Sequence, residues 1–425
     1  MKVLLVGGGG REHAIATAIV KSKRVDRLYC APGNAGIAQI AECAPIGVME
    51  FDRLIAFAKQ KQVDLTVCSQ DDPLCAGIVD AFEAAGLKIF GTRKNAAIIE
   101  GSKAFSKALM KKYHIPTAAY EVFTDAEEAK AWLKANNRFP IVLKADGLAL
   151  GKGVLICNTL EEAQEGVRTI MLDRKFGTAG NELVIEEFMT GREVSALAFV
   201  DGTHYQLMTS SQDHKRIGDG DTGLNTGGMG TFSPSPFFTD EIRRICDEKI
   251  FRPTVDAMKS EGREFRGVLY FGLMLTEDGP KVVEYNTRFG DPETQVILPR
   301  MKTDIIDVFE ACMNGTLDRI RIEFADNAAV CVVLASGGYP VSYEKGKVIH
   351  GLEHFRDRDD IFCFHAGTKF DDRGRIVTSG GRVLGVTALG SDLKDARNRA
   401  YEAVKYIDFE KMYLRHDIGH AIDEA

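Results

Sequence analysis

Short apolar segments alternate with helix-like segments over the first 100 residues, and this alternation constrains the fold more than any other feature. Apolar runs such as 3–6 and 65–68 have the length of strands, and the segments between them have the spacing of helices. Strands separated by helices of about ten residues predict a parallel, doubly wound sheet. We therefore expect residues 1–101 to form an α/β domain.

Two glycine-rich turns follow the first two strands of this sheet: Gly7-Gly-Gly-Gly-Arg-Glu-His13 and Ala31-Pro-Gly-Asn-Ala-Gly36. The carboxyl ends of parallel strands meet at one edge, so both turns should line one crevice that receives an anion. A dinucleotide fingerprint fits poorly, because Glu12 stands where its third glycine belongs. Purely structural turns remain the alternative.

A third glycine-rich run, residues 144–154, follows the apolar segment 141–143. Glycines let backbone amides approach an anion closely, and lysines add positive charge, so the run is typical of a loop that holds nucleotide phosphates. A flexible lysine-bearing hairpin is the alternative. The residues concerned are Lys144, Gly147, Gly151, Lys152 and Gly153.

Glu284-Tyr-Asn286 follows two valines and is expected on a strand, where residues two apart share a face. Two oxygen ligands on one face suit Mg²⁺, and the lack of neighbouring His or Cys counts against zinc. Arg288 and Glu293 follow closely, which makes a bidentate grip on a carboxylate or phosphate plausible. A polar strand face without a metal is the alternative.

Residues 212–230 are rich in charge and glycine and poor in apolar side chains. We predict a long loop, and long loops in compact domains are usually functional. Its His214 is open to three interpretations: a base, a substrate donor or a surface residue.

The composition limits the classes of partner. A net charge of -7 without blocks of like charge gives no footprint for nucleic acid or an anionic membrane. No apolar stretch approaches the roughly 20 residues that span a bilayer, and nine scattered cysteines fit free thiols in a reducing compartment. We expect a cytoplasmic protein that acts on small molecules.

A chain of 425 residues is expected to contain three or four domains. Capping patterns at Thr124–Glu127 and Thr159–Glu162 predict two helices in a small lobe that could close as a lid. The predicted division is an α/β domain at 1–101, a first part at 102–190 with the lid lobe at about 120–190, a central domain with the metal site at 191–326, and a strand-rich domain at 327–425.

Seven segments in order carry a resemblance that covers nearly the whole chain. The sequence resembles the phosphoribosylamine–glycine ligase family, also called glycinamide ribonucleotide synthetases, of the ATP-grasp superfamily. The segments are Gly8–Ala14, Pro32–Gly36, Lys144–Gly153, Gln212–Arg216, Asn225–Gly230, Glu284–Gln295 and Asp417–Gly419.

The resemblance implies an ATP-grasp core and a ligase of purine biosynthesis. Its reaction would join glycine to 5-phosphoribosylamine through glycyl phosphate, consuming ATP with Mg²⁺ or Mn²⁺ and releasing ADP and phosphate. It also favours a monomer.

The resemblance further implies roles for individual residues, with Lys144, Asp213 and Arg288 as the catalytic ones. Those implied to bind ATP are Lys103, Lys144, a flexible cover at 146–153 with Gly147, Gly151, Lys152 and Gly153, the adenine hinge Glu186, Glu187 and Phe188, and Glu193 on the ribose. Glu284 and Asn286 would hold the metal, Asp213 and Arg288 would orient glycine, and Lys215 would be a further substrate-binding residue. Gly9, Gly10, Glu12, Asn34 and Gly36 would line the phosphoribosylamine site.

Two positions depart from the family pattern. Ser69-Gln-Asp-Asp-Pro-Leu74 replaces the usual Gly-Pro-Glu-x-Pro-Leu, so Asp71 could replace the longer carboxylate, and Leu224 replaces a proline without an expected loss of activity. Two other functions stay open: another ATP-grasp carboxylate–amine ligase with a different substrate pair, and a nucleotide-binding protein without turnover.

Overall fold

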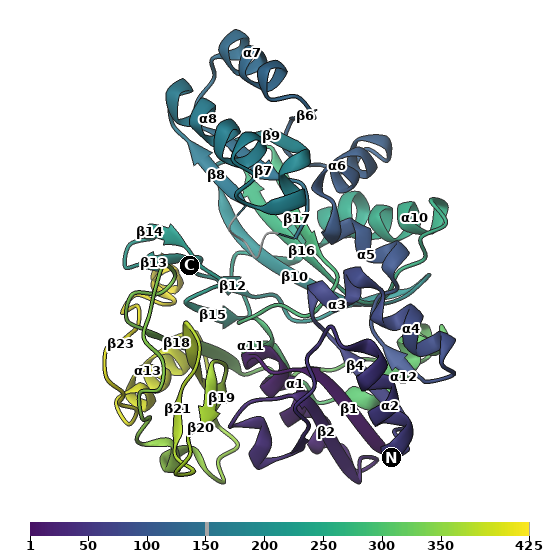
Figure 1. Ribbon diagram of the computed structural model, residues 1–425, viewed down its shortest axis with the longest axis vertical. Coiled ribbons are helices and arrows are strands. Elements are labelled where there is room, and N and C mark those ends of the chain that lie inside the picture. The colour runs from purple at the N-terminus through teal and green to yellow at the C-terminus, as the bar shows by residue number, and fades with distance from the viewer. Residues whose placement is uncertain (149–152, 425) are drawn as a thin grey trace.

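The structure, a computed structural model, describes residues 1–148 and 153–424. Its amino-terminal part is the predicted doubly wound sheet, with parallel strands in the order β3-β2-β1-β4-β5 (Figure 1). The strand order reverses beside β1, so the ends of β1 and β4 flank the crevice where such folds bind ligands. The elements are β1 (Lys2–Gly7), α1 (Gly10–Val20), β2 (Arg27–Pro32), β3 (Glu42–Cys43), α2 (Phe51–Lys61), β4 (Leu65–Cys68), α3 (Asp71–Ala76), α4 (Ile78–Ala84), β5 (Ile89–Phe90) and α5 (Lys94–Gly101).

A second sheet, β6-β9-β7-β8, is antiparallel and forms the projecting lobe at the top of Figure 1. The predicted cap at Thr124 is wrong, because the Asp125 carboxylate accepts the Glu127 and Glu128 amides at 2.9 Å each. A carboxylate that accepts two amides is a stronger cap than a hydroxyl. The Thr159 cap is confirmed. The elements are β6 (Tyr120–Phe123), α7 (Ala126–Asn136), β7 (Ile141–Ala145), β8 (Val154–Cys157), α8 (Leu160–Val167) and β9 (Leu183–Glu187).

The central sheet, β11-β10-β16-β17, is antiparallel and lies below that lobe in Figure 1. Its last strand carries a bulge at Val283, since Val282 pairs with Leu273 but Glu284 pairs with Gly272. Bulges re-aim side chains and occur next to active sites. The elements are α6 (Lys103–Lys112), β10 (Arg192–Asp201), β11 (Tyr205–Leu207), α9 (Asp240–Cys246), α10 (Arg252–Ser260), β16 (Arg266–Thr276), β17 (Gly279–Asn286), α11 (Thr294–Ile297) and α12 (Ile305–Asn314).

The carboxy-terminal sheet, β12-β15-β18-β22-β19 with β23 beside β18, takes two strands from the middle of the chain. The prediction of a long loop over 212–230 is therefore wrong. Residues 230–233 are buried because they pair with β18. Residues 216–225 form a hairpin, which the positive φ of Gly220 and Gly223 allows. The elements are β12 (Gln212–Asp213), β13 (Arg216–Gly218), β14 (Thr222–Asn225), β15 (Gly230–Ser233), β18 (Ala328–Ser336), β19 (Ile361–His365), β20 (Thr368–Phe370), β21 (Ile376–Thr378), β22 (Arg382–Gly390), α13 (Leu393–Val404) and β23 (Met412–Tyr413).

One hydrophobic core joins the amino-terminal, central and carboxy-terminal sheets, and it includes Leu5, Phe199 and Cys331. This shared packing fixes the crevice at the end of β1 relative to β17. Within residues 1–148 and 153–424, no helix has both the length and the hydropathy that crossing a bilayer requires.

Candidate active site

The segment after β7 is tied to the start of α6. The Asp146 carboxylate accepts the Ala104 amide at 2.9 Å, and Lys103 Nζ donates to the Gly147 carbonyl at 2.8 Å. Burial lowers the pKa of Lys103, with Lys144 adding to the shift and Glu284 opposing it. Among the described residues no carboxylate lies within ion-pair distance of this ammonium, so it is available to an arriving anion.

Gly147 has a φ of +142°, and a Cβ there would lie 2.8 Å from Ala179 Cβ. Only glycine fits this close approach. At the other end of the run, the Gly153 carbonyl accepts the Ala145 amide at 2.9 Å. The predicted phosphate ligands Gly151 and Lys152 lie outside the described residues.

Glu186, near the end of β9 in the lobe sheet, lies between two lysines. Its Oε2 is 3.0 Å from Lys144 Nζ and 3.0 Å from Lys107 Nζ. Lys144 also donates to the Val283 carbonyl, exposed by the bulge, at 3.3 Å. Lys144 Nζ also lies 3.0 Å from Glu186 Oε1, which is buried and accepts no well-aligned hydrogen bond from the described residues.

The other predicted hinge residues follow Glu186. Glu187 is exposed and accepts the Ala119 amide at 3.1 Å, and Phe188 is 37 % exposed. Glu193, predicted on the ribose, is 3.1 Å from Lys215 Nζ in this structure. That ion pair is the first cause that raises the pKa of Lys215.

The predicted metal ligands, Glu284 and Asn286, end β17 just after the bulge. Burial alone would raise the pKa of Glu284, but four nearby cations hold that pKa below its usual range. The carboxylate is therefore ionised, as a metal ligand must be. The four cations are Lys215, Lys144, Lys103 and Arg288.

Arg288 is held by partners that fix its plane. Its Nε lies 3.3 Å from Glu100 Oε1, and its other nitrogens donate to the Asn286 side chain at 3.3 Å and to the Phe289 carbonyl at 3.2 Å. Glu100 is itself fixed, since its Oε2 accepts the Thr287 amide at 2.7 Å. The guanidinium is thus pre-oriented beside the predicted metal ligands.

A small cavity of about 10 Å³ brings predicted substrate residues together. Asp213, Lys215 and Glu193 line it together with Ser195 and Tyr270. Burial and then the charge of Glu293 raise the pKa of Asp213 well above its usual range, while Lys215 opposes the shift. A bound ammonium would lower the pKa of Asp213, as Lys215 already does.

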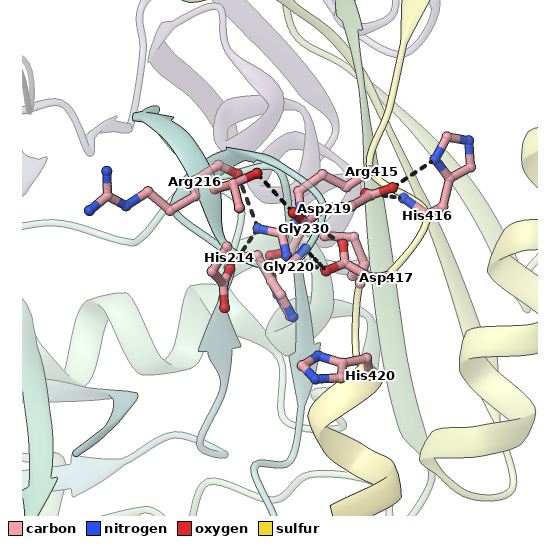
Figure 2. A network of polar contacts seen from close by, with 12 residues as sticks. His214, Arg216, Asp219, Gly220, Gly230, Arg415, His416, Asp417 and His420 are labelled. Carbon is pink, nitrogen blue, oxygen red and sulfur yellow. Dashed lines mark hydrogen bonds and ion pairs between the residues drawn. The ribbon is translucent and has the colours of Figure 1, made fainter. Parts of the chain in front are cut away.

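His214 is buried and lies beside Gly230 and the residues of the chain end (Figure 2). Its Nδ1 lies 3.1 Å from the Gly230 carbonyl and its Nε2 accepts the Gly419 amide at 3.1 Å. These partners require a neutral ring with the proton on Nδ1. None of the three roles left open for His214 fits, because the ring is buried and the Gly230 carbonyl and the Gly419 amide occupy its two nitrogens.

The carboxy-terminal segment 415–419 also makes hydrogen bonds to the β13–β14 hairpin (Figure 2). Arg415 is fully buried and donates to Asp417 at 2.8 and 2.7 Å and to Asp221 at 2.7 Å. Asp417 also accepts the Gly220 amide at 2.8 Å. The hairpin leads directly from Lys215, so the chain end helps to fix one wall of the cavity.

Acidification is expected to cost stability through His214. Burial, with Arg415 adding, lowers the pKa of His214 from 6.5 to about 4 on folding. The unfolded chain therefore binds this proton first, and stability present above pH 6.5 is lost as the pH falls to about 4, by up to about 3 kcal/mol. The urea midpoint should fall less between pH 6.5 and 4.5 in His214→Gln than in the unsubstituted protein; an equal fall would contradict the assignment.

The predicted amino-terminal crevice is assembled from both glycine turns. Glu12 Oε2 accepts the Gly9 amide at 2.7 Å, which places Gly9 and Gly10 at the start of α1. Asn34 donates to the Gly8 carbonyl at 2.8 Å and accepts the Gly36 amide at 2.9 Å. The two turns thus meet at one edge, as the sequence predicts.

The segment after β4 links this crevice to Arg288. Ser69 Oγ accepts the Phe289 amide at 3.0 Å, and Arg11 donates to the Phe289 carbonyl at 3.2 Å. The departure at Ser69 therefore supports the backbone next to Arg288. Asp71 begins α3, where its charge acts on Arg288.

Several residues of the site are not among the predicted ones. Glu100 and Lys107 lie on helices without a motif, and Arg382 comes from the distant β22, where it lies 3.1 Å from Asp291 and donates to the Gly227 carbonyl at 2.7 Å. The only sequence signal for Arg382 is the preceding glycine pair in the run 378–386. Ser195 and Tyr270 sit on apolar strands and carry none.

Three consecutive parts of the chain match phosphoribosylglycinamide synthetase domains: residues 1–100 the N domain, residues 101–294 the ATP-grasp (A) domain and residues 329–421 the C domain. This chain belongs to the phosphoribosylglycinamide synthetase family. A relative from Caldanaerobacter subterraneus named phosphoribosylamine–glycine ligase is 50 % identical over 419 residues, which cover 99 % of each chain. One from Salmonella typhimurium with the same name is 49 % identical over 422 residues, 99 % of this chain and 98 % of the relative.

Solved structures agree with this membership. A crystal structure of phosphoribosylamine–glycine ligase from Thermotoga maritima has a TM-score of 0.85 at 35 % identity and covers 99 % of this synthetase-family chain and 100 % of its own. The biotin carboxylase domain of a Hydrogenobacter thermophilus 2-oxoglutarate carboxylase has a TM-score of 0.76 at 18 % identity, covering 97 % and 91 %. The second likeness shows the shared ATP-grasp fold alone.

Proposed function

We propose that the protein joins glycine to 5-phosphoribosylamine at the expense of ATP, giving glycinamide ribonucleotide, ADP and phosphate in purine biosynthesis. The reaction runs through glycyl phosphate. The observation that carries the proposal is the link through Phe289, which joins Ser69 and Arg11 of the amino-terminal sheet, beside the crevice of the two glycine-rich turns, to Arg288.

In the first half-reaction, an oxygen of the glycine carboxylate attacks the γ-phosphorus of ATP. Little protein nucleophilicity is needed, so charge neutralisation and in-line positioning dominate. Lys103 and Lys144 would neutralise phosphate oxygens, Arg288 would hold the carboxylate, and Asp213 would bind the glycine ammonium. The fixed plane of Arg288 supports this role, because a pre-oriented group supplies proximity without further ordering.

Glu284 and Asn286 are the residues that would hold Mg²⁺, or Mn²⁺. The low pKa of Glu284 and an all-oxygen donor pair fit a hard cation. Bound there, the metal would neutralise charge on the transferred phosphate.

In the second half-reaction, the amine of phosphoribosylamine attacks the glycyl carbonyl. A C–N bond forms, the C–O bond to phosphate breaks, and the amine proton leaves with the phosphate. The turns with Gly9, Gly10, Glu12, Asn34 and Gly36 would hold the ribosyl phosphate at the start of α1. The lobe above Glu186 would exclude water, which otherwise hydrolyses an acyl phosphate.

The setting of this activity belongs to the proposal too. We propose a cytoplasmic monomer that works on these small molecules without nucleic acid or membrane, in keeping with its net charge of -7. The domains would divide at 1–101, 102–190, 191–326 and 327–425. The first would hold the phosphoribosylamine site and the third the metal site.

Oxygen transfer tests the acyl phosphate route. With glycine labelled with ¹⁸O in its carboxylate, the released inorganic phosphate should carry one ¹⁸O per turnover, while ADP carries none. Mass spectrometry of the phosphate measures this. Unlabelled phosphate accompanied by product formation would rule out glycyl phosphate.

Gly36→Ala is expected to weaken phosphoribosylamine binding specifically. A Cβ there would lie 2.4 Å from His365 Cγ and 2.5 Å from His13 Cε1, both in buried rings that cannot easily move. We expect the KM for phosphoribosylamine to rise at least about 10-fold, because misplacement by about 1 Å costs that much or more. Calorimetric nucleotide binding should be unchanged, and an unaltered KM would remove Gly36 from the substrate site.

A further inference from the structure

Lys107 is a buried cation that the proposed reaction does not use. It lies one turn after Lys103 on α6, and its side chain is 2 % exposed. Its ammonium donates to Thr117 Oγ1 at 2.8 Å and lies 3.0 Å from Glu186 Oε2. Glu186 already has Lys144 at 3.0 Å, so one buried carboxylate faces two ammonium groups. Neutrality requires only one of them.

The two lysines differ in how firmly they are placed. Lys107 is anchored through Thr117, whose hydroxyl in turn donates to the Val282 carbonyl at 2.7 Å, and the Val282 amide donates to Pro116 at 2.8 Å. Lys144 lies at the end of β7, where the glycine-rich run begins, and its second partner is a longer contact of 3.3 Å to the Val283 carbonyl. Lys144 is thus the partner that can turn away.

We propose that Lys107 is a positioning residue that serves as the permanent counter-ion of Glu186, so that Lys144 can turn from Glu186 to the ATP phosphates. This rests on the proposed ATP site. A buried carboxylate that loses its last partner is strongly destabilised, and this cost would otherwise oppose nucleotide binding. With Lys107 in place, Glu186 stays paired after Lys144 turns away, and its Oε1, which Lys144 Nζ contacts at 3.0 Å, becomes available to the ligand.

The electrostatics of the unliganded protein agree with this division. Burial lowers the pKa of Lys107 to about 8, with Glu186 opposing the shift and Lys144 adding to it. Movement of Lys144 toward phosphate removes that repulsion and leaves a neutral Lys107–Glu186 pair. Nucleotide binding and the Lys107–Glu186 contact should therefore favour each other.

Calorimetric titration of the full chain with Mg²⁺ and adenylyl imidodiphosphate, a nonhydrolysable ATP analogue, tests the proposal. Lys107→Met should weaken binding at least about 10-fold, because Glu186 then competes with phosphate for Lys144. The melting temperature without nucleotide should stay close to that of the unsubstituted protein, since Lys144 still pairs with Glu186. The matched control is Lys111→Met, one turn later, whose exposed ammonium lies over the same Tyr120 ring at 5.9 Å against 5.7 Å for Lys107.

A double-mutant cycle with Glu186→Gln separates this role from simple packing. Lys107→Met should cost affinity in the unsubstituted background and almost none in the Glu186→Gln background, where no buried charge needs a counter-ion. Equal losses in both backgrounds, or unchanged affinity in Lys107→Met, would overturn the proposal.

A second variant, Lys107→Arg, keeps the test decisive if Lys107→Met is unstable. If Lys107→Met melts early, Lys107→Arg keeps the charge and should bind nearly as tightly as the unsubstituted protein; a loss as large as that of the methionine variant would count against the counter-ion role. Failure of the unsubstituted protein to bind the analogue would instead overturn the proposed ATP site.

Discussion

Replacing Glu284 with glutamine is expected to lower turnover at least about 100-fold while leaving the fold intact, since even residues behind a metal ligand change activity by 10- to 100-fold. The substitution keeps the shape of the side chain and removes a carboxylate whose pKa is held low by Lys215, Lys144, Lys103 and Arg288. The metal would lose its charged ligand.

Turnover of Glu284→Gln should be measured with saturating ATP over a range of Mg²⁺ concentrations. Glu277→Gln is the matched control, because Glu277 is exposed in the turn of the same β16–β17 hairpin. The control should behave as the unsubstituted protein. Normal turnover in Glu284→Gln at low Mg²⁺ would remove the metal assignment.

Arg288→Lys is expected to lower kcat/KM for glycine at least about 100-fold. Three contacts hold the guanidinium plane, to Glu100, Asn286 and Phe289, and an ammonium can satisfy only part of that geometry. A glycine carboxylate would then lose a planar fork that is already in position. The affinity for nucleotide alone should change little.

Steady-state kinetics at varied glycine concentration measure the kcat/KM of Arg288→Lys for glycine. Arg266→Lys provides the comparison, since Arg266 also makes several contacts, to Glu264 and the Met313 carbonyl, at the start of β16. Unchanged glycine kinetics in Arg288→Lys would show that Arg288 does not hold the substrate.

Local pattern was enough to predict the parallel sheet, its two glycine turns and the strand that carries Glu284. These features depend on neighbours in sequence: a turn needs its glycines, and a strand needs alternation. The helix caps show the limit of this reasoning, because Thr124 and Asp125 are both suitable cap residues. In the structure the Asp125 carboxylate is the cap, since it accepts two backbone amides.

Features that depend on distant segments were not predictable in the same way. The sequence of 212–230 is typical of a loop, and its strand β15 forms because it pairs with the distant β18. The role of His214 stayed open because its partner Gly419 lies far away in the sequence. Glu100 pairs with Arg288, and Lys107 pairs with Glu186, only in the folded chain. No spacing in the sequence encodes such pairings.

The most direct test of the proposed ligase is ADP release by the purified protein with ATP and Mg²⁺. Glycine and freshly generated phosphoribosylamine are added separately and then together. We expect sustained release only when both are present, with one glycinamide ribonucleotide formed per ADP. Sustained release that ignores phosphoribosylamine, or that proceeds equally with other amino acids in place of glycine, would contradict the account and indicate a different substrate pair.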